Sequence, residues 1–248
     1  MPLKTYTLRE RPELEDEFER FAAAGWPRFL RQRDELGCGR FWPSLFTTFA
    51  DFQLLLCEGQ RVLAVGHAVP FVWDGRPQDL PESIAGVLEN AVSAREGGRS
   101  PTALSALAAI SGEDQGRGLG GEIVKSMSAV ARQHGLGALV APVRPTLKAR
   151  YALTPMERYV RWTRGDGAPL DPWIRAHWRL GGEIVRVAPR TLVIVGTVAQ
   201  WEEWTEMVFP DSGPYIVPGA LQPVVVDRER DEGRYEDPNV WMHHPIAT

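Results

Sequence analysis

Three observations predict an α/β fold for this chain of 248 residues. An apolar run at Ala103–Ile110 leads into a glycine-rich turn, and an amphipathic helix pattern follows immediately. Earlier in the chain, Phe52–Cys57 and Arg61–Trp73 have the composition of strands and flank Glu58-Gly59-Gln60, which indicates a β-hairpin. Strand and helix patterns then alternate along the rest of the chain, as they do in α/β proteins.

The N-terminal third is expected to contribute one strand and several helices. The strand covers Thr5–Arg9, and helix patterns follow at Glu13–Ala24 and Pro27–Glu35. Acidic residues early in the first helix and a proline at the start of the second both suit helix N-termini. Trp42–Gln53 mixes aromatic and small residues and predicts a further short helix, and a longer helix pattern lies near Ile84–Ala94.

The helix that follows the glycine-rich turn, Gly121–His134, has a clear amphipathic pattern. Ile123, Met127 and Val130 recur at the i, i+4, i+7 spacing of a buried helix face. A short apolar strand, Ala138–Val143, comes next. The turn therefore lies between a buried strand and a helix that faces the core.

The later part of the chain begins with an irregular or helical stretch, Thr146–Trp162. A helix is expected to begin at Asp171-Pro172, because aspartate caps helices and proline suits the first turn, and to end at Leu180 before two glycines. Glu183–Val187 and Thr191–Thr197 supply two late strands.

We predict two regions in the chain. Residues 1–199 form one domain, and residues 200–248 form a C-terminal extension that packs on it. Trp201–Met207 is expected to be a short helix, and Val224–Asp227 with Tyr235–Met242 to form a terminal hairpin or arm.

The composition is that of an ordinary globular protein, with 44% hydrophobic and 24% charged residues. A net charge of −4 argues against general nucleic-acid binding, because a polyanion usually requires a basic surface. No apolar run approaches the roughly 18 residues that cross a bilayer, and the N-terminus lacks a signal-peptide pattern, so we expect a cytoplasmic protein without membrane contact. Cys38 and Cys57 form neither a metal-ligand spacing nor a disulfide framework, and no metal is expected.

The glycine turn (residues 112–120) has the features of a phosphate-binding loop. Glycines let the backbone approach a ligand and point N–H groups at it, and the following helix adds the positive end of its dipole. No Gly-Lys-Ser/Thr sequence ends the turn, so it is not a Walker A loop. The G-x-G-x-x-G spacing is also absent, so it is not a Rossmann fingerprint.

Within this turn, Gln115-Gly116-Arg117-Gly118-Leu119-Gly120 resembles the Q/R-x-x-G-x-G/A motif of the GNAT N-acetyltransferase superfamily, and the element order from about Thr5 to Thr197 is similar too. The resemblance implies a twisted mixed β-sheet flanked by helices. It also implies an acyl-CoA co-substrate, acetyl-CoA or malonyl-CoA, bound where the fourth and fifth strands separate. The backbone of Ile110 would then bind the pantetheine arm. The pyrophosphate would bind the backbone of Gln115, Gly116, Arg117, Gly118, Leu119 and Gly120.

Two further segments, Pro142–Tyr151 and Asp171–Gly181, resemble a narrower group: the GNAT-like domains of polyketide synthase loading modules and their stand-alone actinobacterial relatives. Some of these domains decarboxylate malonyl-CoA or pass an acyl group to a carrier-protein thiol. In that group, a threonine after the fifth strand and a histidine on the next helix are the proposed catalytic pair. Thr146 and His177 match these two positions.

The sequence around His177 supports an inward orientation of its side chain. Trp173, Ile174 and Leu180 lie three or four residues away and share one apolar helix face with it. A desolvated imidazole favours the neutral form, which can accept or relay a proton near pH 7. The alternative, a structural histidine whose ring is bonded to a backbone carbonyl, remains equally open at this stage.

The strand before the glycine turn departs from the superfamily pattern. Many amine acetyltransferases have a glutamate there that acts through water as the base, whereas Ala103–Ile110 contains no carboxylate and Ser105 is its only polar side chain. In a typical family member the position of His177 is a tyrosine that protonates the leaving thiolate. Histidine could serve as that acid or polarise the thioester carbonyl.

Other polar residues have weaker claims to function. His67, on a strand expected to line the acyl pocket, is interpreted as structural rather than catalytic. The cations Arg144, Lys148 and Arg150 either hold a phosphate or carboxylate, or form a solvated face. His243-His244 lacks the companion ligands of a metal site.

Three functions remain open from sequence. The leading one is acyl transfer from CoA to an unidentified acceptor, either a small molecule or an acyl-carrier protein. The second is decarboxylation of malonyl-CoA or a substituted malonyl-CoA, with or without transfer to a carrier protein. The third is a non-catalytic CoA-binding module, which the missing glutamate favours. We expect a monomer or a homodimer.

Overall fold

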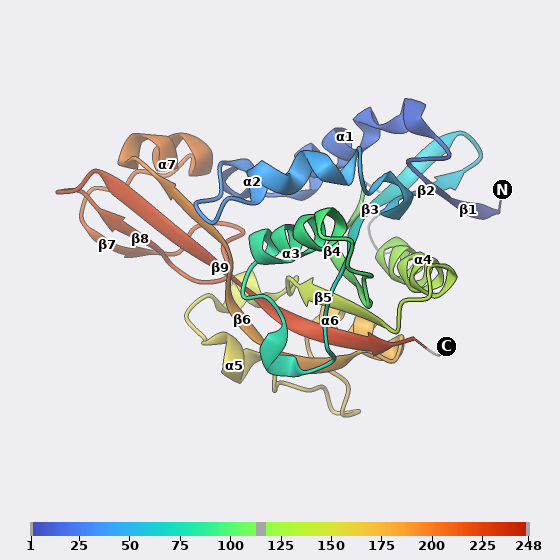
Figure 1. The fold of residues 1–248 in the computed structure, drawn as a ribbon. Coiled ribbons are helices and arrows are strands. Elements are labelled where there is room, and N and C mark those ends of the chain that lie inside the picture. Colours follow the sequence, from blue (N-terminus) through green and yellow to red (C-terminus); the bar gives the residue numbers. More distant parts are fainter. Residues whose placement is uncertain (1, 113–117, 247–248) are drawn as a thin grey trace.

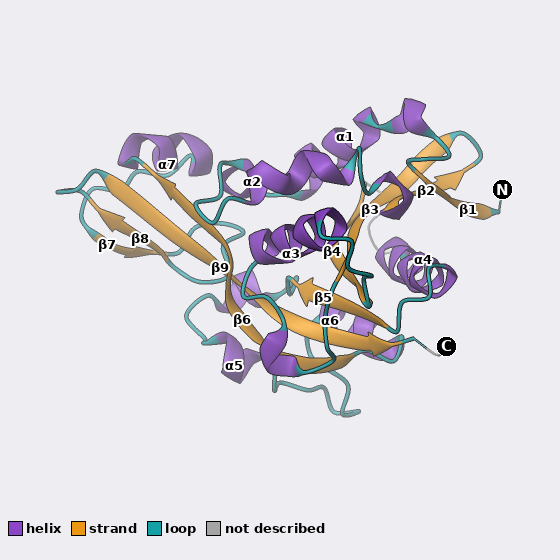
Figure 2. Ribbon diagram, in the orientation of Figure 1, coloured by secondary structure: helices purple, strands orange, loops and turns teal. Residues whose placement is uncertain are grey.

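The computed structural model describes residues 2–112 and 118–246. Its nine strands form one mixed, mostly antiparallel sheet in the order β1-β2-β3-β4-β5-β9-β8-β7, with β6 paired to β9 (Figures 1 and 2). The strands are β1 (Leu3–Thr7), β2 (Gln53–Glu58), β3 (Arg61–Phe71), β4 (Ala103–Ser111), β5 (Ala138–Val143), β6 (Glu183–Gly196), β7 (Gly213–Tyr215), β8 (Val224–Asp227) and β9 (Glu232–Pro245). The helices are α1 (Asp16–Gly25), α2 (Cys38–Phe41), α3 (Ile84–Glu96), α4 (Leu119–Gln133), α5 (Met156–Tyr159), α6 (Pro172–Arg179) and α7 (Val198–Thr205). The predicted α/β class is confirmed.

β4 and β5 are parallel neighbours that separate soon after they meet. Their ladder ends at Ser105 of β4 and Val140 of β5, although β4 continues to Ser111. Close to that point β4 has one extra residue opposite the step from His67 to Ala68 of β3. Such a bulge bends the strand that contains it. The bend therefore accounts for the wedge-shaped opening between the two strands.

Helices cover both faces of the sheet around β3. A Cβ atom on Gly66 would lie only 2.6 Å from the side chain of Ile123 and 2.7 Å from that of Met127, so this face is packed closely against α4. The next residue, His67, points to the opposite face, where its ring centroid lies 4.9 Å from that of Phe18 on α1. The core face predicted for α4 is confirmed, since Ile123 and Met127 are fully buried.

The C-terminal strand lies inside the sheet. One edge of β9 pairs with β6 along most of its length, and the other pairs with β5 at one end and β8 at the other. The terminal hairpin is confirmed as β8 and β9. The prediction of two late strands is wrong: residues 183–196 form the single strand β6, with irregular pairing between Ala188 and Leu192. A boundary after residue 199 thus separates two strands that pair with each other.

The outer halves of β6 and β9 form an arm with β7, β8 and α7, seen at the left of Figure 1. The arm has its own hydrophobic cluster, in which Phe29, Trp201 and Tyr235 are packed together. The indole of Trp201 is fully buried and donates to the carbonyl of Gly233 at 2.7 Å. Trp201 therefore joins α7 to the start of β9.

Two predicted helices are shorter than the sequence indicates. The helix expected at Pro27–Glu35 is a single 3-10 turn, Arg28–Arg31. The buried carboxylate of Asp34 accepts from the backbone of Cys38 and Val193, which draws the chain towards β6 and ends the turn. The helix expected at Trp42–Gln53 consists of two separate 3-10 turns.

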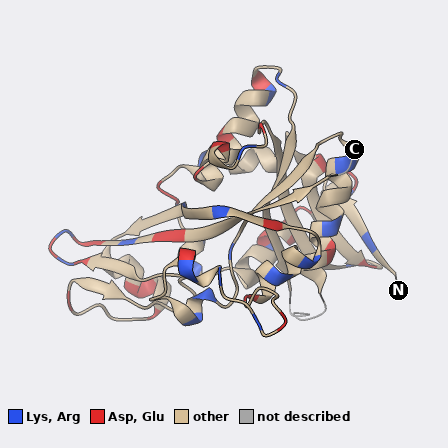
Figure 3. Ribbon diagram, turned by 90° about the horizontal axis from the view of Figure 1, so that it is seen from below, with Lys and Arg blue, Asp and Glu red and all other residues tan. Residues whose placement is uncertain are grey.

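Charged residues of both signs are interspersed along the described chain (Figure 3). With a net charge of −4, the chain has no excess of basic residues to attract a polyanion. None of the helices in the described ranges combines the length and apolar character that a membrane span requires.

Candidate active site

A cavity of about 910 Å³ opens at the wedge between β4 and β5. Residues 106–109 of β4 line one side, Ala141–Val143 of β5 line another, and Gly118–Gly121 at the start of α4 contribute backbone. Thr146 and His177 also line this cavity. The fold therefore brings together the described end of the glycine turn, the threonine and the histidine that the sequence singles out.

The described part of the glycine turn begins at Gly118. Its φ of +75° is left-handed, a conformation that glycine adopts without strain, and its carbonyl accepts from the amides of Gly121 and Glu122 as α4 begins. Leu119 anchors the turn in the core, with 2% of its surface exposed.

The residues predicted to bind CoA fall into three groups. Gly118, Leu119 and Gly120 line the cavity. Ile110 is buried on β4, beyond the last residue pair that β4 forms with β5. The remaining three lie outside the described residues: Gln115, Gly116 and Arg117.

The start of α4 is in close contact with α6. A Cβ atom on Gly120 would lie 2.9 Å from the ring of Trp173, so only glycine fits without displacing that indole. Trp173 in turn lies edge-on to His177, with ring centroids 4.5 Å apart. The N-terminus of α4 and the imidazole are therefore coupled through one aromatic ring.

The start of α6 is fixed by a buried carboxylate. One oxygen of Asp171 accepts from the amides of Trp173 at 2.9 Å and Ile174 at 3.1 Å, which confirms the predicted cap. Its other oxygen accepts from the amide of Leu147 and the hydroxyl of Tyr159, both at 2.8 Å. Burial, followed by the hydrogen bond to Asp171, raises the pKa of Tyr159, which keeps the phenol a donor.

These four hydrogen bonds connect the loop after β5 with the helix that bears His177. Leu147 follows Thr146 directly, so Asp171 holds the backbone next to Thr146 against the first turn of α6. The sequence identifies Asp171 as a cap but gives no sign of this second contact.

The imidazole of His177 is 2% exposed, which confirms its predicted inward orientation. Its Nδ1 lies 2.9 Å from Nε2 of His244, so Nε2 of His177 is the ring nitrogen left for a ligand. Burial, and secondarily the charge of His244, lowers the pKa of His177 to about 3. The ring is therefore neutral at pH 7.

His244 is the member of this site that sequence reasoning misses. It lies on β9, is 3% exposed, and packs against Gly182, where any Cβ atom would collide with its ring. Burial lowers its pKa, while a hydrogen bond with the backbone of Leu180 opposes the shift. Alternation along a strand does predict that one of the pair His243-His244 points inward. It does not predict the partner.

Two cations near the end of β5 already have partners within the protein. The guanidinium Nε of Arg144 lies 3.1 Å from both oxygens of the buried carboxylate of Asp237. Lys148 is 1% exposed and donates to the carbonyls of Tyr151 and Leu221. These contacts stabilise the packing of the loop after β5 against the C-terminal segment.

A mixed sheet whose fourth and fifth strands separate over a glycine turn defines a GNAT-type acyltransferase fold. No protein-family model matches the chain. An arginine N-acetyltransferase of Aspergillus versicolor is 30% identical over 251 residues, which cover 89% of this chain and 85% of the relative. The chain belongs to the GNAT N-acetyltransferase superfamily.

Solved structures support the same fold. The loading GNAT-like domain of CurA from Lyngbya majuscula superposes with a TM-score of 0.64 at 14% identity, over 99% of this chain and 97% of that domain. The GphF GNAT-like decarboxylase, solved with isobutyryl-CoA, gives a TM-score of 0.56 at 18% identity over the whole of both chains. The predicted GNAT fold is confirmed.

Proposed function

We infer that the protein transfers an acyl group from acyl-CoA to an acceptor nucleophile in the wedge between β4 and β5. One observation carries this inference: the N-terminus of α4, Thr146 and His177 all line the same cavity. The start of α4 at Gly118–Gly120 lines the cavity and suits a pyrophosphate, because helix N-termini bind anions through their free amides. The N-acetyltransferase activity in the name of the Aspergillus relative supports the same reaction class.

His177 is the group that acts on the thioester in this proposal. In the transfer, the acceptor attacks the carbonyl carbon, the C–S bond breaks, and the proton from the acceptor ends on the CoA thiolate. In the neutral pair, one proton lies between Nδ1 of His177 and Nε2 of His244. With that proton on His244, the Nε2–H of His177 stabilises the developing oxyanion or protonates the thiolate; with it on His177, the lone pair of Nε2 takes the proton from the acceptor. The hydroxyl of Thr146 supplies a second hydrogen-bond donor at the same cavity.

Turnover of acetyl-CoA tests this function. The purified protein should release free CoA in the presence of an acceptor amine, and His177→Ala should reduce kcat by about a hundredfold or more, as loss of a general acid or oxyanion donor does. Binding of acetyl-CoA, followed by calorimetry, should persist in the variant. Acceptor-dependent CoA release that is equal in both proteins would contradict the role of His177.

Decarboxylation of malonyl-CoA is the second candidate. It is favoured by Ala103–Ser111, which offers no carboxylate to deprotonate an amine, and by a neutral imidazole placed to polarise a thioester. The decarboxylase name of GphF supports it as well. Incubation with malonyl-CoA and mass spectrometry separates the two. Acetyl-CoA formed without an acceptor favours decarboxylation, and intact malonyl-CoA discards it.

A further inference from the structure

A second cavity, of about 260 Å³, lies beneath α1 and adjoins the active-site cavity. The two share four lining residues: Glu19, Ala22, Trp26 and Trp42. We call this second cavity the α1 pocket. It is lined by Glu15, Asp16, Phe18, Glu19, Ala22, Trp26, Trp42, Phe46 and His67.

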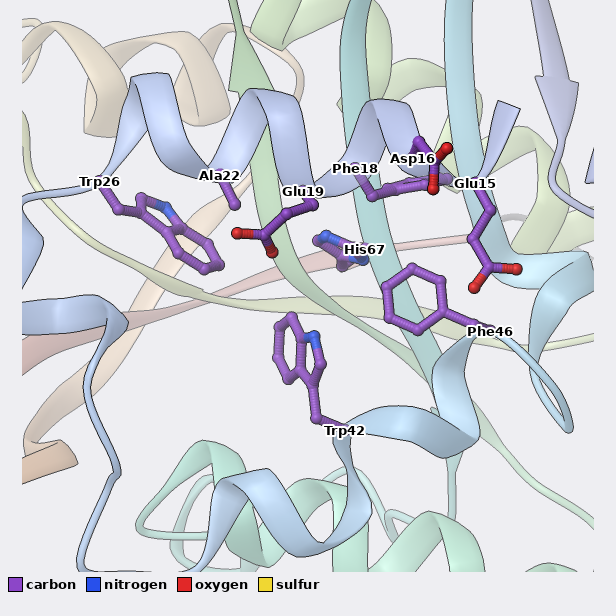
Figure 4. A pocket seen from close by; sticks show the side chains of 9 residues that line it. All are labelled: Glu15, Asp16, Phe18, Glu19, Ala22, Trp26, Trp42, Phe46 and His67. Atoms are coloured by element: carbon purple, nitrogen blue, oxygen red, sulfur yellow. The ribbon is translucent and has the colours of Figure 1, made fainter. Parts of the chain in front are cut away.

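One face of α1 supplies much of the pocket wall. Glu15, Glu19, Ala22 and Trp26 recur at the i, i+4, i+7, i+11 spacing of a single helix face. The small side chain of Ala22 leaves room between the carboxylates and the indole. Figure 4 shows the carboxylate of Glu19 and the rings of Trp26 and Trp42 around His67.

The pocket has an unbalanced negative charge at its rim. Within the described residues, the carboxylates of Glu15 and Asp16 have no ion-pair or side-chain hydrogen-bond partner. Glu19 has one distant partner, Arg31, at 3.5 Å. Three carboxylates therefore line the pocket, and among the described residues only Glu19 has a cation beside it.

The hydrogen bonds of Gln53 determine which nitrogen of His67 faces the pocket as an acceptor. Nε2 of Gln53 donates to the carbonyls of Phe49 at 2.9 Å and Ala68 at 2.8 Å, so its Oε1 is the acceptor. That oxygen lies 3.0 Å from Nδ1 of His67, which must therefore carry the proton. Nε2 of His67 is left with a lone pair and, among the described residues, no partner.

The surroundings of His67 keep it in this neutral form. The ring is 2% exposed and lies against Phe18, Trp42 and Phe46, with ring centroids 4.9, 5.1 and 5.7 Å away. Burial lowers its pKa to about 3. His67 therefore remains a hydrogen-bond acceptor at pH 7, although a structural role is what the sequence indicates for it.

We propose that the α1 pocket is the acceptor site and that it binds a cationic nitrogen group, a guanidinium or an ammonium, of the acceptor molecule. The cation donates an N–H to Nε2 of His67, lies against the faces of Trp26 and Trp42, and is neutralised by the rim carboxylates. The inference rests on the proposed acyl transfer. The wall that the two cavities share places the bound cationic group next to the wedge between β4 and β5, where the acyl group would be transferred. An uncharged acceptor, such as the thiol of a carrier protein, would leave the lone pair of His67 and the carboxylates of the pocket without partners.

Calorimetry on the CoA-loaded protein tests the site with three probes: L-arginine, agmatine and Nα-acetyl-L-citrulline, an arginine analogue that has no cationic nitrogen. We expect both cations to bind at least tenfold more tightly than acetylcitrulline. Glu19→Gln should weaken arginine binding about fivefold, the effect of one charge at close range in water, and Trp42→Leu about tenfold. Glu17→Gln is the matched control, because Glu17 lies on the same helix but pairs with Arg20 and does not line the pocket.

The outcomes separate this proposal from the proposed function. Equal binding of arginine and acetylcitrulline, equal effects of the Glu17 and Glu19 substitutions, or no probe binding to a protein that still binds acetyl-CoA would each overturn the acceptor site. Loss of acetyl-CoA binding itself would instead refute acyl transfer. His67→Phe keeps a ring but has no acceptor. After comparison with wild type by melting temperature, it should bind the cations about tenfold more weakly, the effect of one lost hydrogen bond to a charged group.

Discussion

Replacing Asp171 with alanine should destabilise the protein and separate the two sides of the active site. The carboxylate accepts four hydrogen bonds while only 2% of the residue is exposed. Loss of the helix cap costs about 1 kcal/mol. The buried donors of Leu147 and Tyr159 lose their partner, at about 1–3 kcal/mol each. We expect the free energy of unfolding to fall by about 4 kcal/mol, and the melting temperature by about 12 °C in a chain of this length.

Urea denaturation followed by circular dichroism measures the free energy of unfolding. Acetyl-CoA turnover well below the melting temperature measures whether the two sides of the active site are still correctly placed. Tyr159→Phe removes one donor and leaves the other three bonds to Asp171, so it should cost about 1 kcal/mol. Asp166→Ala is the matched control, since Asp166 is exposed and forms one turn hydrogen bond and one exposed ion pair, with Arg164. It should change stability by about 0.5 kcal/mol or less. The reasoning is refuted if the Asp171 and Asp166 variants unfold alike, or if the folded Asp171 variant keeps wild-type kcat.

Three further predictions follow from the site geometry. Gly120→Ala should weaken CoA binding about tenfold, because the new Cβ displaces Trp173, whereas Gly121→Ala, which meets open space, should not; calorimetry compares them. Between pH 7 and pH 5, the free energy of unfolding of the wild type should fall by about 2 kcal/mol more than that of His67→Gln. The pKa of His67 is about 3 when folded and 6.5 when unfolded, so stability present above pH 6.5 is lost as the pH falls; denaturation at the two pH values that shows identical losses contradicts this. His244→Gln, which keeps an N–H donor, should retain more kcat than His244→Phe at equal KM.

Local patterns in the sequence were sufficient to predict α4, its core face and the inward face of α6. Each depends on a spacing within about a dozen residues, such as Trp173 to His177, so the periodicity of a single element determines the outcome. The cap at Asp171 is similarly local. These features of the candidate site could be predicted from the sequence for this reason.

The remaining features depend on pairings between distant segments. His244 reaches His177 only because β9 pairs with β5, which no local pattern specifies. The same holds for Gln53, whose amide fixes the tautomer of His67 through contacts on both neighbouring segments. The merging of two predicted strands into β6 has the same cause, because β9 supplies the partner that extends it.

A crystal structure with bound acetyl-CoA tests the central claim most directly. The account predicts the pyrophosphate on the amides at Gly118–Gly120 and the thioester oxygen within about 3 Å of Nε2 of His177 or the hydroxyl of Thr146. Acetyl-CoA bound elsewhere, or a thioester that lies beyond hydrogen-bond reach of both side chains, would contradict it.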